Sequence, residues 1–87
     1  MIIGRVIGEI HATIKHPFYE GKRLLVIDKT TPDGKSTGDY LIAADSVGAG
    51  ADETVLVLDE GNGARQVFFD KDAPVRSVVV GIIDDIF

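Results

Sequence analysis

The apolar residues of this chain alternate with polar ones or form short runs, a pattern that predicts β-strands. Five segments carry the pattern, and they are rich in Ile, Val, Leu and Thr. These predicted strands cover residues 2–13, 22–30, 39–45, 53–59 and 76–86. Between the second and the third, Thr31-Pro32-Asp33-Gly34-Lys35 is a strong turn signal, with Pro ahead of an Asp-Gly pair. Residues 22–45 are therefore predicted to form one long hairpin.

One short helix is predicted between the fourth and the fifth strand. It covers residues 61–69, where Ala64-Arg65-Gln66-Val67-Phe68 follows a glycine-rich entry. At most two turns fit there, and the phenylalanines lower the helix propensity. Residues 16–21, which include Pro17, are predicted to form a loop.

Five strands and one short helix in 87 residues predict an all-β fold, and most simply a small five-stranded barrel. Closing the sheet hides the strand edges, which would otherwise be exposed to other chains. Gly4, Gly8 and Gly81 lie inside strand patterns, where the tight bends of a barrel require glycine. An open sheet packed by the helix is the alternative. The length fits a single domain, residues 1–87.

The last predicted strand is apolar on both faces. Val78 and Val80 lie on one face, and Val79 and Ile83 lie on the other. Such a strand has to be covered on both sides. The second cover is either the short helix or another copy of the chain, and the residues leave both open. Oligomerisation has a physical motive, because a domain of this size buries only a thin core.

The composition excludes several classes of site. There is no cysteine, so disulfides, thiolate metal sites and a cysteine nucleophile are excluded. The net charge is −5 and the nine basic residues are scattered, which argues against nucleic acid as a partner. The longest apolar run is far shorter than the roughly 20 residues of a membrane span, and Arg5 comes too early for a signal peptide. A cytoplasmic protein without a membrane partner is expected.

The most glycine-rich stretch invites comparison with a phosphate-binding loop. In Gly48-Ala49-Gly50-Ala51-Asp52-Glu53, however, the third glycine of the dinucleotide fingerprint is replaced by Glu53. Two acidic side chains would lie beside the phosphate, and a strand rather than a helix follows. A Walker motif is also absent, since the sequence contains no Gly-Lys-Ser/Thr. A tight connection between two strands is the better interpretation, and no cofactor is predicted.

Catalytic and metal-binding patterns are equally weak. His11 and His16 are five residues apart, so they do not share one face of a strand or helix. The carboxylate pairs Asp59-Glu60 and Asp84-Asp85 are sequence neighbours, which point to opposite faces of a strand and form no acid/base couple. No serine lies in a G-x-S-x-G elbow. We therefore predict no catalytic residue and no metal ligand, although carboxylates converging from different strands would escape this reasoning.

Arg65 is the one charged residue with an unusual position. It is expected at the start of the short helix, where the positive end of the helix dipole disfavours a guanidinium. An arginine there often reaches away to a fixed partner such as a carboxylate or carbonyl group. A solvated Arg65 is the alternative.

The sequence contains a central motif made up of Asp45-Ser46-Val47-Gly48-Ala49-Gly50, Glu53, Val55-Leu56-Val57 and Gly61-Asn62-Gly63-Ala64-Arg65-Gln66. With this motif the sequence resembles the bacterial microcompartment vertex proteins, the pentameric shell proteins of carboxysomes and of ethanolamine-utilisation and related metabolosomes. It extends outward to the first strand, the hairpin and the closing strand through residues 4–10, 24–34 and 80–84.

The chain departs from the family pattern at two places. Asp52 stands where the family usually has glycine, but Asp tolerates left-handed backbone better than most residues, so the turn can survive. Gly61-Asn62-Gly63 replaces a more hydroxyl-rich Gly-Ser-Ser, which keeps a corner but removes hydroxyl contacts.

The resemblance implies a barrel related to the oligonucleotide/oligosaccharide-binding (OB) fold, assembled as a cyclic homopentamer. Such a pentamer closes the vertices of a polyhedral shell built otherwise from hexameric proteins, and it has no catalytic role. Its candidate contacts at the subunit interface or the ring axis are Gly48, Ala49, Gly50, Glu53, Gly63, Ala64, Arg65 and Gln66. The alternative function is a small OB-type module that binds single-stranded nucleic acid or a sugar, against which the charge and the lack of an aromatic–basic groove argue.

Overall fold

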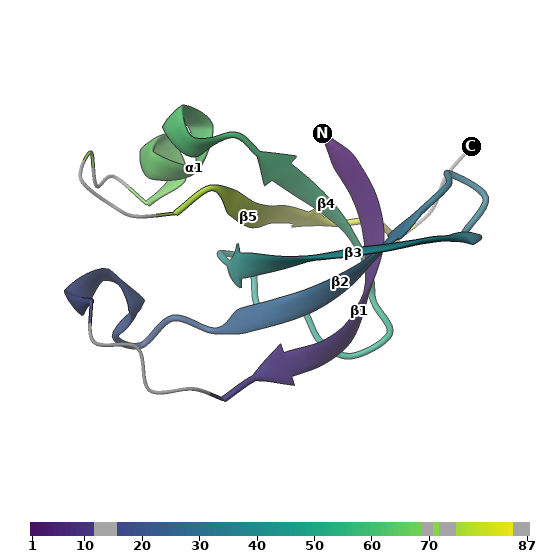
Figure 1. The fold of residues 1–87 in the computed structure, drawn as a ribbon, viewed down its shortest axis with the longest axis horizontal. Coiled ribbons are helices and arrows are strands. Elements are labelled where there is room, and N and C mark those ends of the chain that lie inside the picture. Colours follow the sequence, from purple (N-terminus) through teal and green to yellow (C-terminus); the bar gives the residue numbers. More distant parts are fainter. Residues whose placement is uncertain (12–15, 69–70, 72–74, 85–87) are drawn as a thin grey trace.

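Five strands close into a barrel in the computed structural model, which describes residues 1–11, 16–68, 71 and 75–84 (Figure 1). The strands are β1 (Ile2–Ile10), β2 (Leu24–Thr30), β3 (Ser36–Asp45), β4 (Thr54–Asp59) and β5 (Ser77–Ile82). They follow one another around the barrel in the order β1-β2-β3-β5-β4, and β4 pairs with β1 to close it. All pairings are antiparallel except that of β3 with β5. The predicted barrel is confirmed, and the open sheet is wrong.

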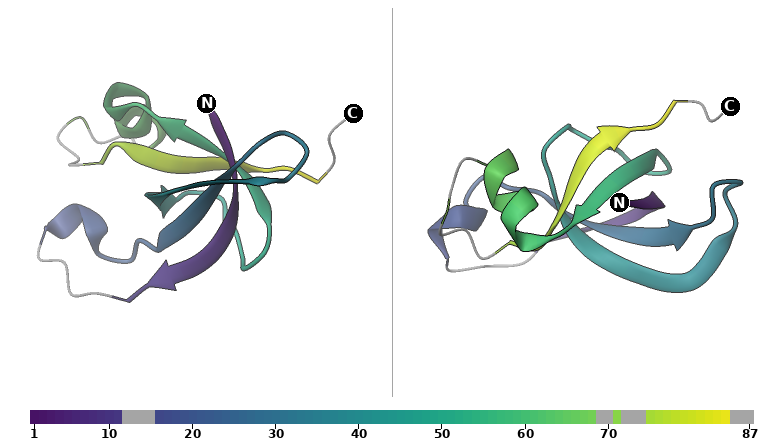
Figure 2. Two further views of the ribbon diagram at one scale, coloured as in Figure 1. Left: turned by 45° about the vertical axis from the view of Figure 1, so that its right-hand side comes forward. Right: turned by 90° about the horizontal axis from the view of Figure 1, so that it is seen from above.

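The hairpin of β2 and β3 is the longest feature of the fold. Its turn is held by the Thr31 N–H, which donates to the Lys35 carbonyl at 2.9 Å, and by Gly34, whose φ is 90°. β3 begins at Ser36, three residues earlier than the pattern predicted, and the turn projects beyond the barrel at the end opposite the helix (Figure 1 and Figure 2). The predicted continuations of the first strand to residue 13 and of the last to residue 86 reach outside the described residues.

Glycine allows the barrel to bend at β1. Gly4 pairs with Lys29 of β2 and with Val55 of β4, so a neighbouring strand flanks it on each side. A Cβ atom at Gly4 would lie 2.3 Å from Ile27 Cγ2 and 2.7 Å from the Asp28 carbonyl oxygen. The predicted need for glycine is confirmed here. At Gly8 and Gly81 an added Cβ would make only ordinary contacts, but the register shifts beside both residues.

Two apolar clusters hold the molecule together. The inner one fills the barrel, and its buried members are Val6, Leu25, Ile27, Ala43, Ala49, Val55, Val57 and Val79. The outer one lies between the barrel, helix α1 (Gly61–Val67) and the 3-10 helix η1 (Pro17–Tyr19), and its buried members are Phe18, Ala44, Ala64, Val75 and Val78. Figure 2 shows both helices at the same end of the molecule.

The outer cluster covers the outward-facing side of β5. Val79 belongs to the inner cluster, whereas Val78 packs outward against the cluster that contains Ala64 of α1 and Phe18 of η1. Both side chains are fully buried within a single chain. Of the two alternatives, the helix provides the second cover, together with η1, and no second copy is needed for these residues.

η1 replaces the loop predicted over residues 16–21, and it is tied to α1 by its aromatic residues. His16 caps it, because the Phe18 N–H donates to His16 Nδ1 at 3.1 Å. The Phe18 ring packs edge-on against Phe68 just after α1, with 5.0 Å between centroids, and the Lys22 ammonium lies 5.0 Å from the Phe18 centroid.

Within the described part of the chain, no helix is long and apolar enough to cross a membrane.

Candidate functional site

The loop over residues 46–53, called here the glycine loop, joins β3 to β4 and is organised by the carboxylate of Asp45. This carboxylate accepts from the backbone N–H groups of Val47 at 3.1 Å, Gly48 at 3.0 Å and Ala49 at 3.3 Å. Gly48 has a φ of 78°, a left-handed conformation that favours glycine. The loop is therefore a built turn, and the predicted tight connection between two strands is confirmed.

Arg23 fixes the same loop from the side of β2. Its Nη1 donates to Asp45 Oδ2 at 3.0 Å and to the Ala49 carbonyl oxygen at 2.8 Å, and its Nε donates to Glu9 Oε1 at 3.0 Å. The Asp45 side chain is only 5% exposed. The hydrogen bond from Arg23 is the main reason why the pKa of Glu9 lies below its ordinary value. Arg23 is a residue that the sequence reasoning missed, because nothing local links residues 9, 23 and 45.

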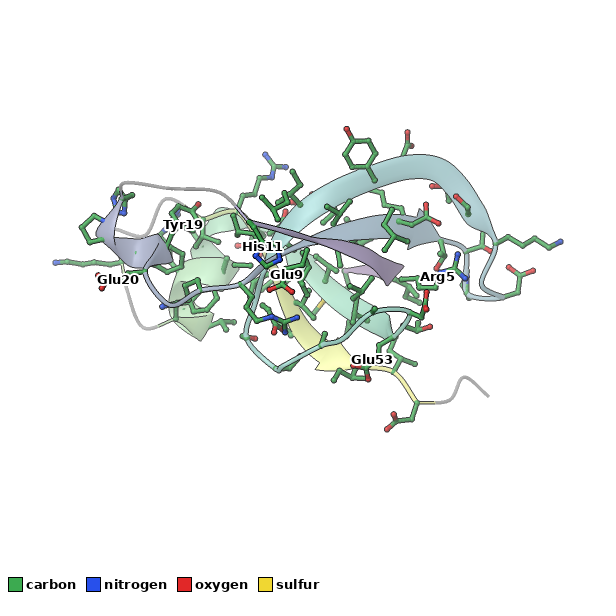
Figure 3. The ribbon with its side chains drawn as sticks, turned by 90° about the horizontal axis from the view of Figure 1, so that it is seen from below. Arg5, Glu9, His11, Tyr19, Glu20 and Glu53 are labelled. Carbon is green, nitrogen blue, oxygen red and sulfur yellow. The ribbon has the colours of Figure 1, made fainter. Side chains whose placement is uncertain are left out.

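The far end of the glycine loop is fastened by Glu53. Its Oε1 accepts from the Gly50 N–H at 2.5 Å, and its carbonyl oxygen accepts from the Val6 N–H at 3.0 Å. Asp52 adopts a φ of 66°, which confirms that this residue keeps the left-handed turn. Glu53 lies far from Tyr19 and Glu20, which mark the helical end of the molecule (Figure 3). Glu53 is thus a turn-closing residue within its own chain.

Ala49 points inward from the glycine loop. It is fully buried in the inner cluster, where it closes one end of the barrel. Its side chain therefore serves the fold of its own chain, whereas Ser46, Val47, Ala51 and Asp52 of the same loop are exposed.

The predicted short helix over residues 61–69 is confirmed as α1, and the second glycine-rich segment forms its first turn rather than the separate corner that the sequence suggested. Gly61, Asn62 and Gly63 are already helical, since the Ala64 N–H donates to the Glu60 carbonyl oxygen at 2.9 Å. The reason is packing, which overrides the poor helix propensity of glycine. A Cβ atom at Gly63 would lie 2.6 Å from Leu58 Cδ2, and Ala64 is fully buried against the barrel. Small residues let this short helix lie close to the sheet.

Arg65 consequently lies in the last turn of α1, and its expected place at the helix start is wrong. A cation is favourable there, because the C-terminal end of the helix dipole is negative. Its Nη2 donates to Asn62 Oδ1 on the same helix, and its guanidinium lies over Gly61. Among the described residues it forms no ion pair with a carboxylate. Gln66 beside it is exposed.

The two candidate segments do not meet within one chain. The glycine loop precedes Thr54 and α1 follows Asp59, so they lie at opposite ends of β4 (Figure 1). A site that uses both of them requires two subunits.

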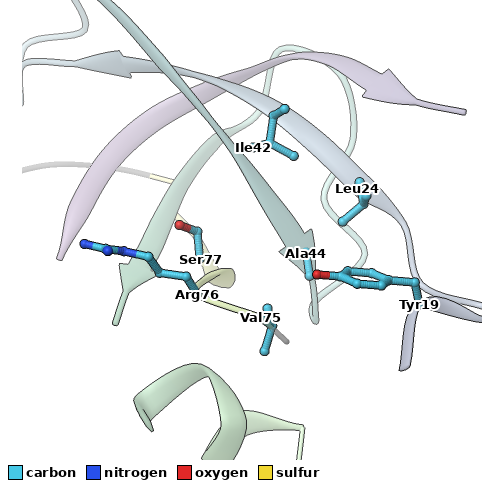
Figure 4. Close-up of a pocket in the computed structure, with 7 residues that line it drawn as sticks. All are labelled: Tyr19, Leu24, Ile42, Ala44, Val75, Arg76 and Ser77. Carbon is cyan, nitrogen blue, oxygen red and sulfur yellow. The ribbon is translucent and has the colours of Figure 1, made fainter. Parts of the chain in front are cut away.

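A shallow apolar groove of about 480 Å³, called here the β3 groove, lies on the outer surface where β3 and β5 diverge (Figure 4). Its lining residues are Tyr19, Leu24, Ile42, Ala44, Val75, Arg76 and Ser77. The sequence reasoning missed it, because it arises between strands whose pairing order is set by the barrel. Leu24 alternates along its strand with the buried Leu25 and Ile27, and this alternation was the available signal.

The described residues contain no group of three or more His, Asp or Glu side chains that could hold a metal ion. Of the two carboxylate pairs, Asp59 accepts from Ser77 Oγ at 2.6 Å and from Arg76 Nε at 3.1 Å, and these contacts lower its pKa, the Ser77 bond most. Asp85 of the other pair lies outside the described residues. Asp59 therefore joins β4 to β5.

Comparison with known proteins gives one consistent result. Residues 1–84 match the family described as ethanolamine utilisation protein EutN/carboxysome. The carboxysome shell vertex protein CcmL of Thermosynechococcus vestitus is 42% identical over 86 residues, which cover 99% of this chain and 86% of that protein. The bacterial microcompartment shell vertex protein EutN of Escherichia coli K12 is 34% identical, with 99% of this chain and 90% of that protein covered. The GrpN pentameric microcompartment shell protein from Rhodospirillum rubrum has a similar structure, with a TM-score of 0.87, 34% identity, and 100% and 98% coverage of the two chains.

Proposed function

The chain belongs to the ethanolamine utilisation protein EutN/carboxysome family, and we propose that it is a structural vertex protein in the shell of a bacterial microcompartment. Five copies form a ring, and the ring caps a vertex of the polyhedral shell in the cytoplasm. The observation that carries this function is the likeness of the whole chain to a pentameric shell protein, with a TM-score of 0.87 over 100% of this chain. The function is non-catalytic, and it replaces the alternative of a binding module for single-stranded nucleic acid or a sugar.

The geometry of a shell explains why a five-fold piece is needed. Flat sheets of hexamers cannot close by themselves, whereas a cyclic pentamer introduces curvature at a corner. The partners of the pentamer rim are accordingly hexameric shell proteins. In a cyclic ring each subunit offers one patch to one neighbour and a different patch to the other, so the interface is heterologous.

The residues of the two candidate segments are proposed to lie at that interface or near the ring axis. In α1, the guanidinium of Arg65 retains donor groups beyond its bond to Asn62, and Gln66 is exposed. Gly63 and Ala64 support this face by holding the helix close to the sheet. The turn of the glycine loop has a fixed shape, which is set by Gly48, Ala49, Gly50 and Glu53. A neighbouring copy can therefore bind this loop without the entropic cost of ordering it.

Native mass spectrometry tests the ring directly. At micromolar concentration we expect a particle of five chains, each of 9.3 kDa. A single chain under these conditions would contradict the proposed function.

Replacement of Arg65 tests the role of α1. Arg65→Ala is expected to raise the concentration at which the ring dissociates about tenfold, which corresponds to roughly 1.4 kcal/mol. The matched control is Arg5→Ala, which removes an exposed arginine from β1. If both variants remain fully pentameric on dilution, the interface role of Arg65 is wrong while the function stands.

A further inference from the structure

Asn62 and Gly63 bring an exposed carboxamide next to an unhindered backbone nitrogen. Asn62 is the one asparagine of the chain, and it is exposed in the first turn of α1. Gly63 has no side chain to shield its backbone nitrogen. A Cβ atom at Gly63 would lie 2.6 Å from Leu58 Cδ2, so the packing of α1 against the barrel favours glycine at this position.

The first turn of α1 is weakly held at its backbone. The N–H groups of residues 61–63 precede the first intrahelical hydrogen bond, which the Ala64 N–H donates to the Glu60 carbonyl oxygen at 2.9 Å. In the part of the chain that the structure describes, the Glu60 side chain makes no capping hydrogen bond to this turn. Two glycines lower its helix propensity further. The turn can therefore open locally while Ala64 stays buried against the barrel.

Arg65 acts on the carboxamide of Asn62. The Asn62 Oδ1 accepts a hydrogen bond from Arg65 Nη2. A charged donor draws electrons from the carbonyl group and stabilises negative charge that develops on its oxygen. The Cγ atom of Asn62 is therefore a better electrophile than that of a solvated asparagine.

We infer that Asn62 is a site of spontaneous deamidation, with the Gly63 nitrogen as the nucleophile. The first turn has to open for this, because helical backbone turns the Gly63 nitrogen away from Asn62 Cγ. The Gly63 nitrogen then loses its proton and bonds to Cγ, the bond from Cγ to the side-chain nitrogen breaks, and ammonia leaves with the proton. Water hydrolyses the cyclic imide at either carbonyl, which yields aspartate or isoaspartate at position 62.

The reaction changes the charge of α1. An aspartate at position 62 adds one negative charge to a chain whose net charge is −5. It lies three residues before Arg65, so the present hydrogen bond becomes an ion pair on the helix surface. A carboxylate is also favourable in the first turn of a helix, whereas isoaspartate lengthens the main chain and disrupts the turn. This chemistry belongs to the single folded chain and does not require the ring.

Ageing of the folded wild-type protein at mildly alkaline pH tests the inference. Ion-exchange chromatography is expected to show one more acidic species, and peptide mapping to place the new acid at residue 62. Ageing in isotopically heavy water should add one heavy oxygen atom there, as imide hydrolysis requires. Asn62→Gln is the matched control, because glutamine keeps a neutral carboxamide but closes the larger ring far more slowly. The inference is overturned if Asn62→Gln gains the acidic species equally fast, or if the wild type gains none while a peptide of residues 58–66 reacts.

Two further variants distinguish opening of the first turn from unfolding of the whole chain. Val6 belongs to the inner cluster, whereas α1 packs into the outer one. Val6→Ala should raise the unfolded population about tenfold or more without changing the rate of deamidation. Gly61→Ala strengthens the first turn and should slow deamidation several-fold. If the rate in Val6→Ala instead rises in step with the unfolded population measured by urea unfolding, the reaction takes place in the unfolded chain and the inference is wrong.

Discussion

The glycine loop and helix α1 are both rich in glycine, yet they use it for opposite purposes. In the loop, Gly48 supplies a left-handed backbone conformation, and an added Cβ would meet nothing within 4 Å. In α1, the glycines are helical, and at Gly63 the constraint is the space beside Leu58. One region is held by hydrogen bonds to Asp45, Arg23 and Glu53, and the other by apolar packing. Glycine density alone does not distinguish a conformational requirement from a steric one.

Removal of the Asp45 carboxylate is expected to have the largest effect on this comparison. Asp45→Ala leaves three loop N–H groups without their acceptor and removes one of the acceptors of Arg23, and it should cost about 3 kcal/mol of unfolding free energy. Urea unfolding at fixed protein concentration measures the loss. Asp45→Asn retains an acceptor and should cost clearly less. Equal, small losses in both variants would show that the loop does not depend on this carboxylate.

Replacement by alanine should destabilise the protein at Gly48 in the glycine loop and stabilise it at Gly61 in α1. Gly48→Ala forces a side chain into left-handed backbone and is expected to cost about 1–2 kcal/mol. Gly61→Ala raises helix propensity by up to about 1 kcal/mol, and its added Cβ meets only the flexible end of Arg65, at 3.0 Å from Nη1. Thermal unfolding of both variants beside the wild type measures the signs. Destabilisation by both changes would remove the distinction between the regions.

Acidification should weaken both regions slightly. The pKa of Glu9, which belongs to the Arg23 network, and that of Asp59, which joins β4 to β5 near α1, are lowered in the folded protein. A lowered folded pKa stabilises the protein above the ordinary carboxyl pKa of about 4, and this stabilisation is lost as the pH falls through the folded value. The midpoint temperature of thermal unfolding should therefore decrease as the pH is lowered below about 4.

Single substitutions separate the two contributions to the acid response. In Glu9→Gln and in Asp59→Asn the midpoint temperature of unfolding should still decrease with falling pH, but less steeply than in the wild type. Each variant lacks one of the titrating groups. A stability that falls mainly between pH 7 and pH 5 would contradict this assignment, since both carboxylates remain ionised in that range.

The sequence predicts the barrel because its signals are local. The alternation of apolar and polar residues predicts the strands. Gly4 has no room for a side chain, and Asp52 has a left-handed backbone conformation. The clamp formed by Arg23 was not predictable, because its partners come from three separate segments of the chain. The helix predicted over residues 61–69 is confirmed as Gly61–Val67, but the place of Arg65 in its last turn was not predicted. The β3 groove depends on which strands become neighbours, and alternation does not encode that order.

The double cover of β5 has a consequence for the timing of assembly. Both apolar clusters are completed inside one chain, so a subunit buries Val78 and Val79 before it meets any neighbour. Folding is then a first-order event, whereas ring formation depends on concentration. A subunit that leaves a ring is therefore expected to keep its fold.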